Sequence, residues 1–162
     1  MVFGDFVSTV LRITKSEIAG LKFGDFDVET RTIYIQRQIT SNPVVSKGGS
    51  EIQSYEVIEK PPKTDNSYRR LRIPEAIAEE IEKRRAVVEA NKLQYGEQYF
   101  DHDYISCQEN GLPHSMAAMN GVLTRLCARN GLPHITVHGL RHMYATILIE
   151  MKVPLIKISA LL

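Results

Sequence analysis

The chain has 162 residues and a formal net charge of +1, from 20 basic and 19 acidic side chains. This length fits one domain that can bury a sizeable core, and the near-neutral total does not by itself indicate a nucleic-acid binder. Two cysteines make no disulfide framework, no apolar run could cross a bilayer, and no signal peptide begins the chain, so we expect a cytoplasmic protein with no membrane partner.

The first half of the chain predicts one helix followed by a small antiparallel sheet. The helix is expected over about 4–20, because apolar residues recur at helical spacing and Gly20 ends the pattern. Three strands with β-branched or alternating residues are expected after it, at 32–39, 54–59 and 69–73. The segment 42–50, N-P-V-V-S-K-G-G-S, contains one proline and two glycines and is expected to form an extended loop.

The second half of the chain is predicted to be helical. Helices are expected at 74–93, 115–129 and 137–152, and a last one opens at Pro154. The predicted fold class is therefore α+β, mostly helical, with a small three-stranded antiparallel sheet. Mixed acidic and basic side chains along 74–93 are typical of a solvated outer face.

One short sequence occurs twice, as C-Q-E-N-G-L-P-H at 107–114 and as C-A-R-N-G-L-P-H at 127–134. A zinc site is one interpretation, but paired ligands in zinc fingers lie about two to five residues apart, closer than each cysteine and histidine here. The other interpretation is turn chemistry, in which N-G-L-P closes a hairpin in the first copy and ends a helix in the second. We therefore expect no metal.

Basic residues gather in two regions of this nearly neutral chain. The first, at 60–72, contains Lys60, Lys63, Arg69, Arg70 and Arg72. The second, after Pro113, contains Arg125, Arg129, Arg141, Lys152 and Lys157. Each region includes only one acidic residue.

The segment 135–146, I-T-V-H-G-L-R-H-M-Y-A-T, opens the helix predicted at 137–152. Thr136 is the predicted N-cap. His138 and Arg141 lie three residues apart, so both project from one face of the first turn, where backbone N–H groups also point outward. This combination predicts an anion site, most naturally for phosphate.

The same segment resembles the H-x-L-R-H box of the tyrosine recombinase (phage integrase) family, and the preceding N-G-L-P-H-I-T resembles integrases of mobile elements. The resemblance implies a catalytic domain that breaks and rejoins DNA. In that family a tyrosine attacks the phosphodiester and forms a 3′-phosphotyrosyl bond without a cofactor, a metal or a small-molecule substrate. Double-stranded DNA is then the expected partner.

The resemblance also implies roles for residues of the box. Arg141 would neutralise charge on the non-bridging oxygens, because a planar guanidinium offers two parallel hydrogen bonds and keeps its proton. His138 would handle the proton of the nucleophile or bond a phosphate oxygen, with a structural histidine as the alternative. His142 points elsewhere on the helix and is expected to be a buried hydrogen-bonding residue.

Two further catalytic candidates lie earlier in the chain. Lys63, in P-P-K-T-D-N-S-Y-R-R-L-R-I-P, matches the family's turn where a lysine protonates the leaving 5′-oxygen; an ordinary surface lysine is the alternative. The family's first arginine belongs to T-G-x-R-x-x-E. Alignment on Glu17 puts Thr14 at that position, so Arg12 is the candidate, about half a helical turn away.

Five basic residues outside this catalytic set are the expected DNA contacts: Lys60, Arg69, Arg70, Arg125 and Arg129.

The family's nucleophile lies beyond a G-H-x-S segment that follows a helix like I-K-I-S-A-L-L, with which this chain stops at Leu162. We also expect the family's core-binding and arm-binding domains to be absent. We therefore expect 1–162 to be a single, partial catalytic domain that lacks its nucleophile and binds DNA weakly without cutting it. The alternative is a decayed integrase that acts as an inert or protein-interaction module and self-associates through its apolar segment 153–162.

Overall fold

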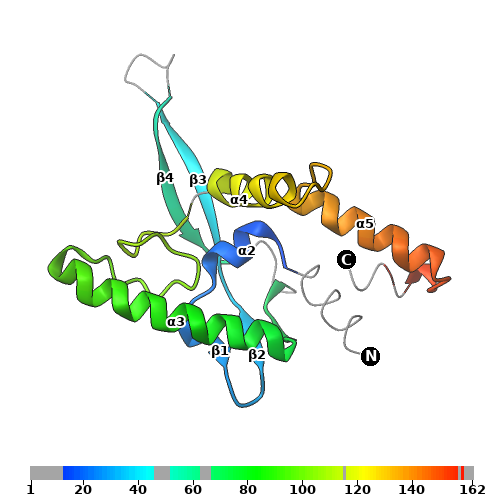
Figure 1. Ribbon diagram of the computed structural model, residues 1–162, viewed down its shortest axis with the longest axis horizontal. Helices are drawn as coiled ribbons and strands as arrows, with labels where there is room; N and C mark the ends of the chain where they lie inside the picture. Colours follow the sequence, from blue (N-terminus) through cyan, green and yellow to red (C-terminus); the bar gives the residue numbers. More distant parts are fainter. Residues whose placement is uncertain (1–12, 46–51, 63–66, 115, 157, 159–162) are drawn as a thin grey trace. The chain divides into compact units, whose positions relative to one another are not determined.

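The computed structural model describes residues 13–45, 52–62, 67–114, 116–156 and 158 and combines helices with antiparallel strands (Figure 1). The predicted α+β class is confirmed. The chain divides into two compact units, one of residues 16–116 and the other of residues 1–15 with 117–162.

A three-stranded antiparallel sheet lies in the larger unit. Its strands, in the order β1-β2-β5, are Phe26–Asp27, Thr32–Ile35 and Arg69–Arg72. The side chains of Ile33, Ile35 and Leu71 are at most 3% exposed, whereas Tyr34 and Arg70, at alternate positions, are exposed. This alternation is what the two-residue period of a half-buried strand requires.

The second sheet is a hairpin of β3 (Gln38–Val45) and β4 (Ile52–Lys60) (Figure 1). The prediction of one strand over 32–39 is wrong, because Gln36 and Arg37 separate β2 from β3 and donate hydrogen bonds to Asp25 instead. The predicted loop over 42–50 is wrong for 42–45, which belong to β3, and its remaining residues 46–50 lie outside the described residues. Both strands of a two-stranded sheet are edges, so Pro43 is tolerated there.

Helix α3, Glu75–Tyr95, begins after Pro74 and buries Ala78, Ile81 and Val88. Two arginines next to one another fix it to the rest of the larger unit. Arg84 donates to the carbonyl oxygens of Ile105, at 3.1 Å, and Cys107, at 2.6 Å. The guanidinium of Arg85 lies 4.6 Å from the ring centre of Phe23.

Both predicted turns of the repeated N-G-L-P sequence are confirmed. In the first copy, Cys107 pairs with Pro113 across a tight turn, and the N–H of Gln108 donates to the carbonyl of Leu112 at 2.8 Å. In the second copy, the N–H of Leu132 donates to the carbonyl of Cys127 at 2.9 Å, past a glycine with positive φ, which closes helix α4 in a Schellman motif. Both cysteines are buried and free, and the described residues include no group of side chains suited to a metal ion.

The smaller unit contains α4 (Met116–Arg129) and α5 (Val137–Glu150). Helix α2, Lys15–Gly20, whose residues from 16 onward belong to the larger unit, is the described end of the helix predicted over 4–20. After α5, the N–H of Ile158 donates to the carbonyl of Pro154 at 3.1 Å, which agrees with a helical turn opened by that proline. Among the helices of the described ranges, none is long and apolar enough to cross a membrane.

Candidate phosphate-binding site

The N-terminus of α5 is capped as the sequence predicts. Thr136 has an extended backbone, and its Oγ1 accepts a hydrogen bond from the N–H of Gly139 at 2.9 Å. A Cβ at Gly139 would lie only 3.2 Å from that same oxygen, so glycine allows the close approach. The cap satisfies one of the N–H groups that a helix start leaves free, and it fixes where the others point.

His138 and Arg141 are the second and fifth residues of α5, so the helix puts them on one face at this N-terminal end. The first turn of α5 contains no acidic residue. The partial positive charge of the helix N-terminus is therefore not offset by a carboxylate in the same turn. This charge favours the binding of an anion there. The prediction that His142 is buried is wrong, since that side chain is exposed.

Two of the four predicted catalytic residues, Arg12 and Lys63, lie outside the described residues, and of His138 and Arg141 only the backbone is described. Their neighbours in the chain are described. Helix α2 follows Arg12, and Lys63 falls between the end of β4 and the start of β5. The contacts of α2, β4 and β5 therefore show how the chain is held on either side of these two candidates.

Arg69, at the start of β5, makes a bidentate ion pair with Glu17 of α2. Its Nη1 lies 2.8 Å from Oε1, and its Nη2 lies 3.0 Å from Oε2. Glu17 is only 6% exposed, so its carboxylate needs a charged partner. The pairing gives Arg69 a role inside the protein, and the sequence signal for it is an acidic residue at an otherwise apolar position of a helix.

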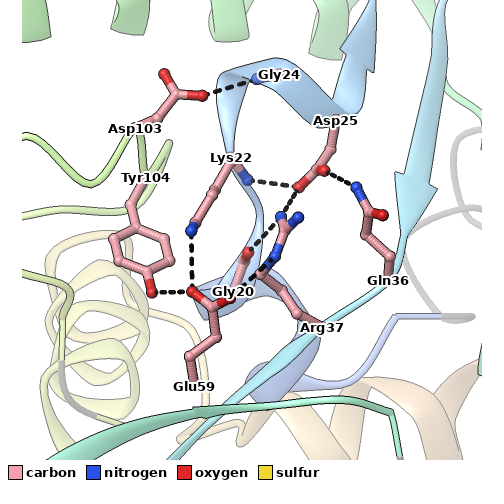
Figure 2. A network of polar contacts seen from close by, with 9 residues as sticks. All are labelled: Gly20, Lys22, Gly24, Asp25, Gln36, Arg37, Glu59, Asp103 and Tyr104. Atoms are coloured by element: carbon pink, nitrogen blue, oxygen red, sulfur yellow. Dashed lines mark hydrogen bonds and ion pairs between the residues drawn. The ribbon is translucent and has the colours of Figure 1, made fainter.

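A second cluster surrounds the buried carboxylate of Asp25 (Figure 2). Arg37 and Gln36 donate to it through Nη1 and Nε2, and the backbone N–H of Lys22 does so at 2.8 Å. Asp25 closes the short helix η1, Phe23–Asp25. The sequence analysis did not single out this cluster, because its members are far apart in the chain.

Arg37 also reaches a second carboxylate, that of Glu59 near the end of β4, with its Nε 3.4 Å from Oε1 (Figure 2). The ammonium of Lys22 lies 2.9 Å from Oε2 of Glu59, and the phenol of Tyr104 donates to the same oxygen at 2.6 Å. Burial tends to raise the pKa of Glu59, but the bonds from Tyr104 and Lys22 outweigh it and lower the pKa. Burial and the neighbouring carboxylate raise the pKa of Tyr104.

The remaining predicted DNA contacts are exposed. Lys60 ends β4, and Arg70 on β5 lies with its guanidinium carbon 5.4 Å from the ring centre of Tyr34. Arg125 and Arg129 are exposed on α4 in the other unit. In the predicted apolar segment, Leu155 and Ile156 are 72% and 82% exposed, whereas Ile158 is buried.

The chain is similar to known proteins over nearly all of its length. Residues 5–162 match the Phage integrase family. A tyrosine recombinase XerC-like protein of Caldanaerobacter subterraneus subsp. tengcongensis is 31% identical over 153 residues, which cover 93% of this chain and 39% of that protein.

Solved structures show the same fold. The Tn1549 transposon integrase in complex with a circular intermediate DNA gives a TM-score of 0.64 at 19% identity, over 97% of this chain and 49% of that one. The XerA recombinase gives a TM-score of 0.58 at 15% identity, over 96% of this chain and 46% of that one. The chain therefore spans half or less of the length of these relatives.

Proposed function

Because the chain belongs to the phage integrase family, we propose that its residues form the phosphate-binding part of a site that breaks and rejoins DNA strands. The observation that carries this proposal is the capped N-terminus of α5, which brings His138 and Arg141 to one face of a helix end with no acid in its first turn. Phosphodiester DNA is the substrate class, and recombination of DNA is the process that the family supports.

In the proposed reaction, a tyrosine oxygen forms a bond to phosphorus, the bond from phosphorus to the 5′-oxygen breaks, and a proton passes to that leaving oxygen. Arg141 binds the non-bridging oxygens, on which negative charge grows during the attack. His138 takes the proton of the nucleophile or bonds a phosphate oxygen. Lys63 supplies the proton to the 5′-oxygen, and Arg12 is the candidate for a second arginine on the phosphate.

We assign the nucleophile to no tyrosine of residues 1–162, so these residues by themselves bind DNA without cutting it. Two described tyrosines have phenol groups that contact other residues inside the larger unit. The phenol of Tyr104 donates a hydrogen bond to Glu59. Burial together with Cys107 raises the pKa of Tyr99 to about 12. Both changes disfavour the phenolate that an attack on phosphorus requires.

DNA binding is assigned to exposed cations in each unit: Lys60, Arg70, Arg125 and Arg129. Arg69 is excluded from this set because its guanidinium is committed to Glu17. Contacts of this kind position a duplex without reading its sequence.

The test is fluorescence anisotropy of a labelled duplex at low salt, comparing the unchanged chain with Arg141→Ala. We expect Arg141→Ala to weaken binding by about 10-fold to 100-fold, because it removes charge-assisted hydrogen bonds to phosphate. Lys83→Ala is the control, since it removes one positive charge from an exposed position on α3 that pairs with Glu80. Equal affinities of these two folded variants would contradict the proposal.

The exposed side chains of Leu155 and Ile156 favour one second candidate, a module that binds a further copy of the chain. Sedimentation velocity over a range of concentrations tests it. Self-association that Ile156→Ser abolishes, in a chain that shows no response to DNA, would support the interaction module over the DNA-binding proposal.

A further inference from the structure

The three-stranded sheet of the larger unit has one face that is directed away from its buried side chains. Strand alternation places every second residue of β2 and β5 on that face. The register sets Tyr34 opposite Arg70 and Thr32 opposite Arg72. We call these four residues the outer sheet face. Tyr34 is 38% exposed, both arginines are exposed, and Thr32 is half-buried.

The outer sheet face is positively charged. The strand β1 adds one acidic residue beside it, Asp27, which lies opposite Thr32 in the register. The Oδ1 atom of Asp27 accepts hydrogen bonds from the N–H of Glu29 at 3.0 Å and from the N–H of Thr30 at 3.1 Å. Its carboxylate therefore already stabilises the turn that follows β1. Two guanidinium groups face one carboxylate used in this way, so a polyanion complements the surface.

An aromatic ring lies within this positive surface. The guanidinium carbon of Arg70 is 5.4 Å from the ring centre of Tyr34, which is the geometry of a cation–π contact. Unpaired nucleobases stack on exposed aromatic rings and on guanidinium planes. The bases inside a duplex are covered on both faces by their neighbours, so they do not stack on a protein ring in this way. The ring therefore favours a single strand over a duplex.

The two arginines also suit the spacing of charge along one nucleic-acid strand. Arg70 and Arg72 are two residues apart, which is about 6.8 Å along an antiparallel strand. Charges in one strand of stacked DNA are about 3.4 Å apart along its axis, so the two guanidinium groups match phosphates two nucleotides apart. The carboxylates of an acidic peptide would pair with the arginines but make no use of the ring of Tyr34.

We propose that the outer sheet face binds single-stranded DNA, with Tyr34 and Arg70 stacking on an unpaired base and Arg72 holding a phosphate. The choice of DNA as the polyanion rests on the proposed function. In that reaction a broken strand has a free 5′-hydroxyl end, and unpaired bases next to the break are ligands of this chemistry. The inference adds Tyr34 and Arg72 to the DNA contacts and adds unpaired DNA to the ligands.

The test is fluorescence anisotropy of a labelled oligothymidylate of about 12 nucleotides at low salt. We expect Tyr34→Leu to weaken binding at least about fivefold, because it keeps an apolar side chain but removes the ring. Tyr34→Phe is expected to stay within about twofold of the unchanged chain, because it keeps the stacking surface. Tyr95→Leu is the matched control with unchanged affinity, since Tyr95 lies at the end of α3 and donates to Glu109 at 3.3 Å.

A tryptophan at the same position gives a second readout. The chain contains no tryptophan, so the fluorescence of Tyr34→Trp reports on the outer sheet face alone. We expect oligothymidylate to quench this fluorescence, because a stacked base quenches the indole. Unchanged fluorescence at a saturating oligothymidylate concentration would overturn the inference.

Three results of the affinity measurement would also overturn it. They are equal affinities of Tyr34→Leu and Tyr34→Phe, no binding of oligothymidylate, and displacement of oligothymidylate by polyglutamate as effectively as by unlabelled oligothymidylate, since charge alone would explain that result. The proposed function is tested separately, by the loss of duplex affinity in Arg141→Ala. A chain that shows this loss but no effect of Tyr34→Leu contradicts only the outer sheet face.

Discussion

Arg69 and Arg70 are adjacent in the chain, yet their environments are opposite. Strand alternation turns Arg69 toward Glu17, which is 6% exposed, and turns Arg70 toward solvent over the ring of Tyr34. The same side-chain chemistry therefore stabilises the fold at one position and is available for a ligand at the next.

We expect Arg69→Ala to lower the free energy of unfolding by about 2 to 4 kcal/mol, because it leaves a buried carboxylate without its guanidinium partner. Arg70→Ala is expected to cost less than about 1 kcal/mol, as for an exposed cation over an aromatic ring. Urea unfolding followed by circular dichroism measures both. Equal losses in the free energy of unfolding would show that the buried carboxylate of Glu17 does not need the guanidinium of Arg69.

At the scale of elements, the two N-G-L-P turns share a sequence but differ in packing. Gly111 and Gly131 both have positive φ, at 87° and 63°. A Cβ at Gly111 would lie 2.3 Å from the carbonyl oxygen of Phe100 and 2.8 Å from the ring of Tyr99, whereas a Cβ at Gly131 would meet nothing within 4 Å.

Gly131→Ala is therefore expected to destabilise the chain by about 1 kcal/mol, the cost of a left-handed conformation for alanine. Gly111→Ala is expected to cost about 2 to 4 kcal/mol, because overpacking against backbone adds to that penalty. Thermal unfolding of the two variants compares them directly. A larger loss for Gly131→Ala would contradict the packing shown around the first turn.

The elements that the sequence predicted well are those with local signals. Glycine, proline and the Thr136 cap mark turns and helix starts through bonds to residues within five positions, and the structure confirms them. The break between β2 and β3 was missed, because Gln36 and Arg37 fit the alternating pattern and their partner Asp25 lies more than ten residues away. Long-range partners of this kind leave no periodic signal.

The residues of the candidate site also fall into those with a local sequence signal and those without one. His138 and Arg141 are recognisable because they share one helical turn with a cap. Nothing local distinguishes Arg69 from Arg70, so both were predicted as DNA contacts, and only the fold separates the arginine paired with Glu17 from the exposed arginine. The roles of all four catalytic candidates stay predictions, because Arg12 and Lys63 lie outside the described residues and only the backbone of His138 and Arg141 is described.

For the whole molecule, the distribution of charge matters more than its total of +1. The acids of α3 sit largely in ion pairs along that helix, such as Glu80 with Lys83 and Glu82 with Arg85. Cations such as Lys60 and Arg125 are exposed on other elements. A nearly neutral chain can therefore still present positive surface to DNA.

We expect the logarithm of the DNA association constant to fall with the logarithm of salt concentration, with a slope of about −3 to −5. This range corresponds to the four exposed DNA contacts together with Arg141, each neutralising about one phosphate. Anisotropy titrations between about 50 and 200 mM salt give the slope. A slope near zero would contradict phosphate binding by these cations.

The two buried cysteines lie in different compact units, Cys107 at 2% exposure in the larger and Cys127 at 4% in the smaller. A thiol reagent reaches a buried cysteine only when its surroundings open. The chain therefore contains one natural reporter of opening for each unit. The labelling rates of the two cysteines, followed by mass spectrometry, would show whether the two units open together or independently. The same measurement with DNA present would show whether DNA slows the opening of one unit more than that of the other.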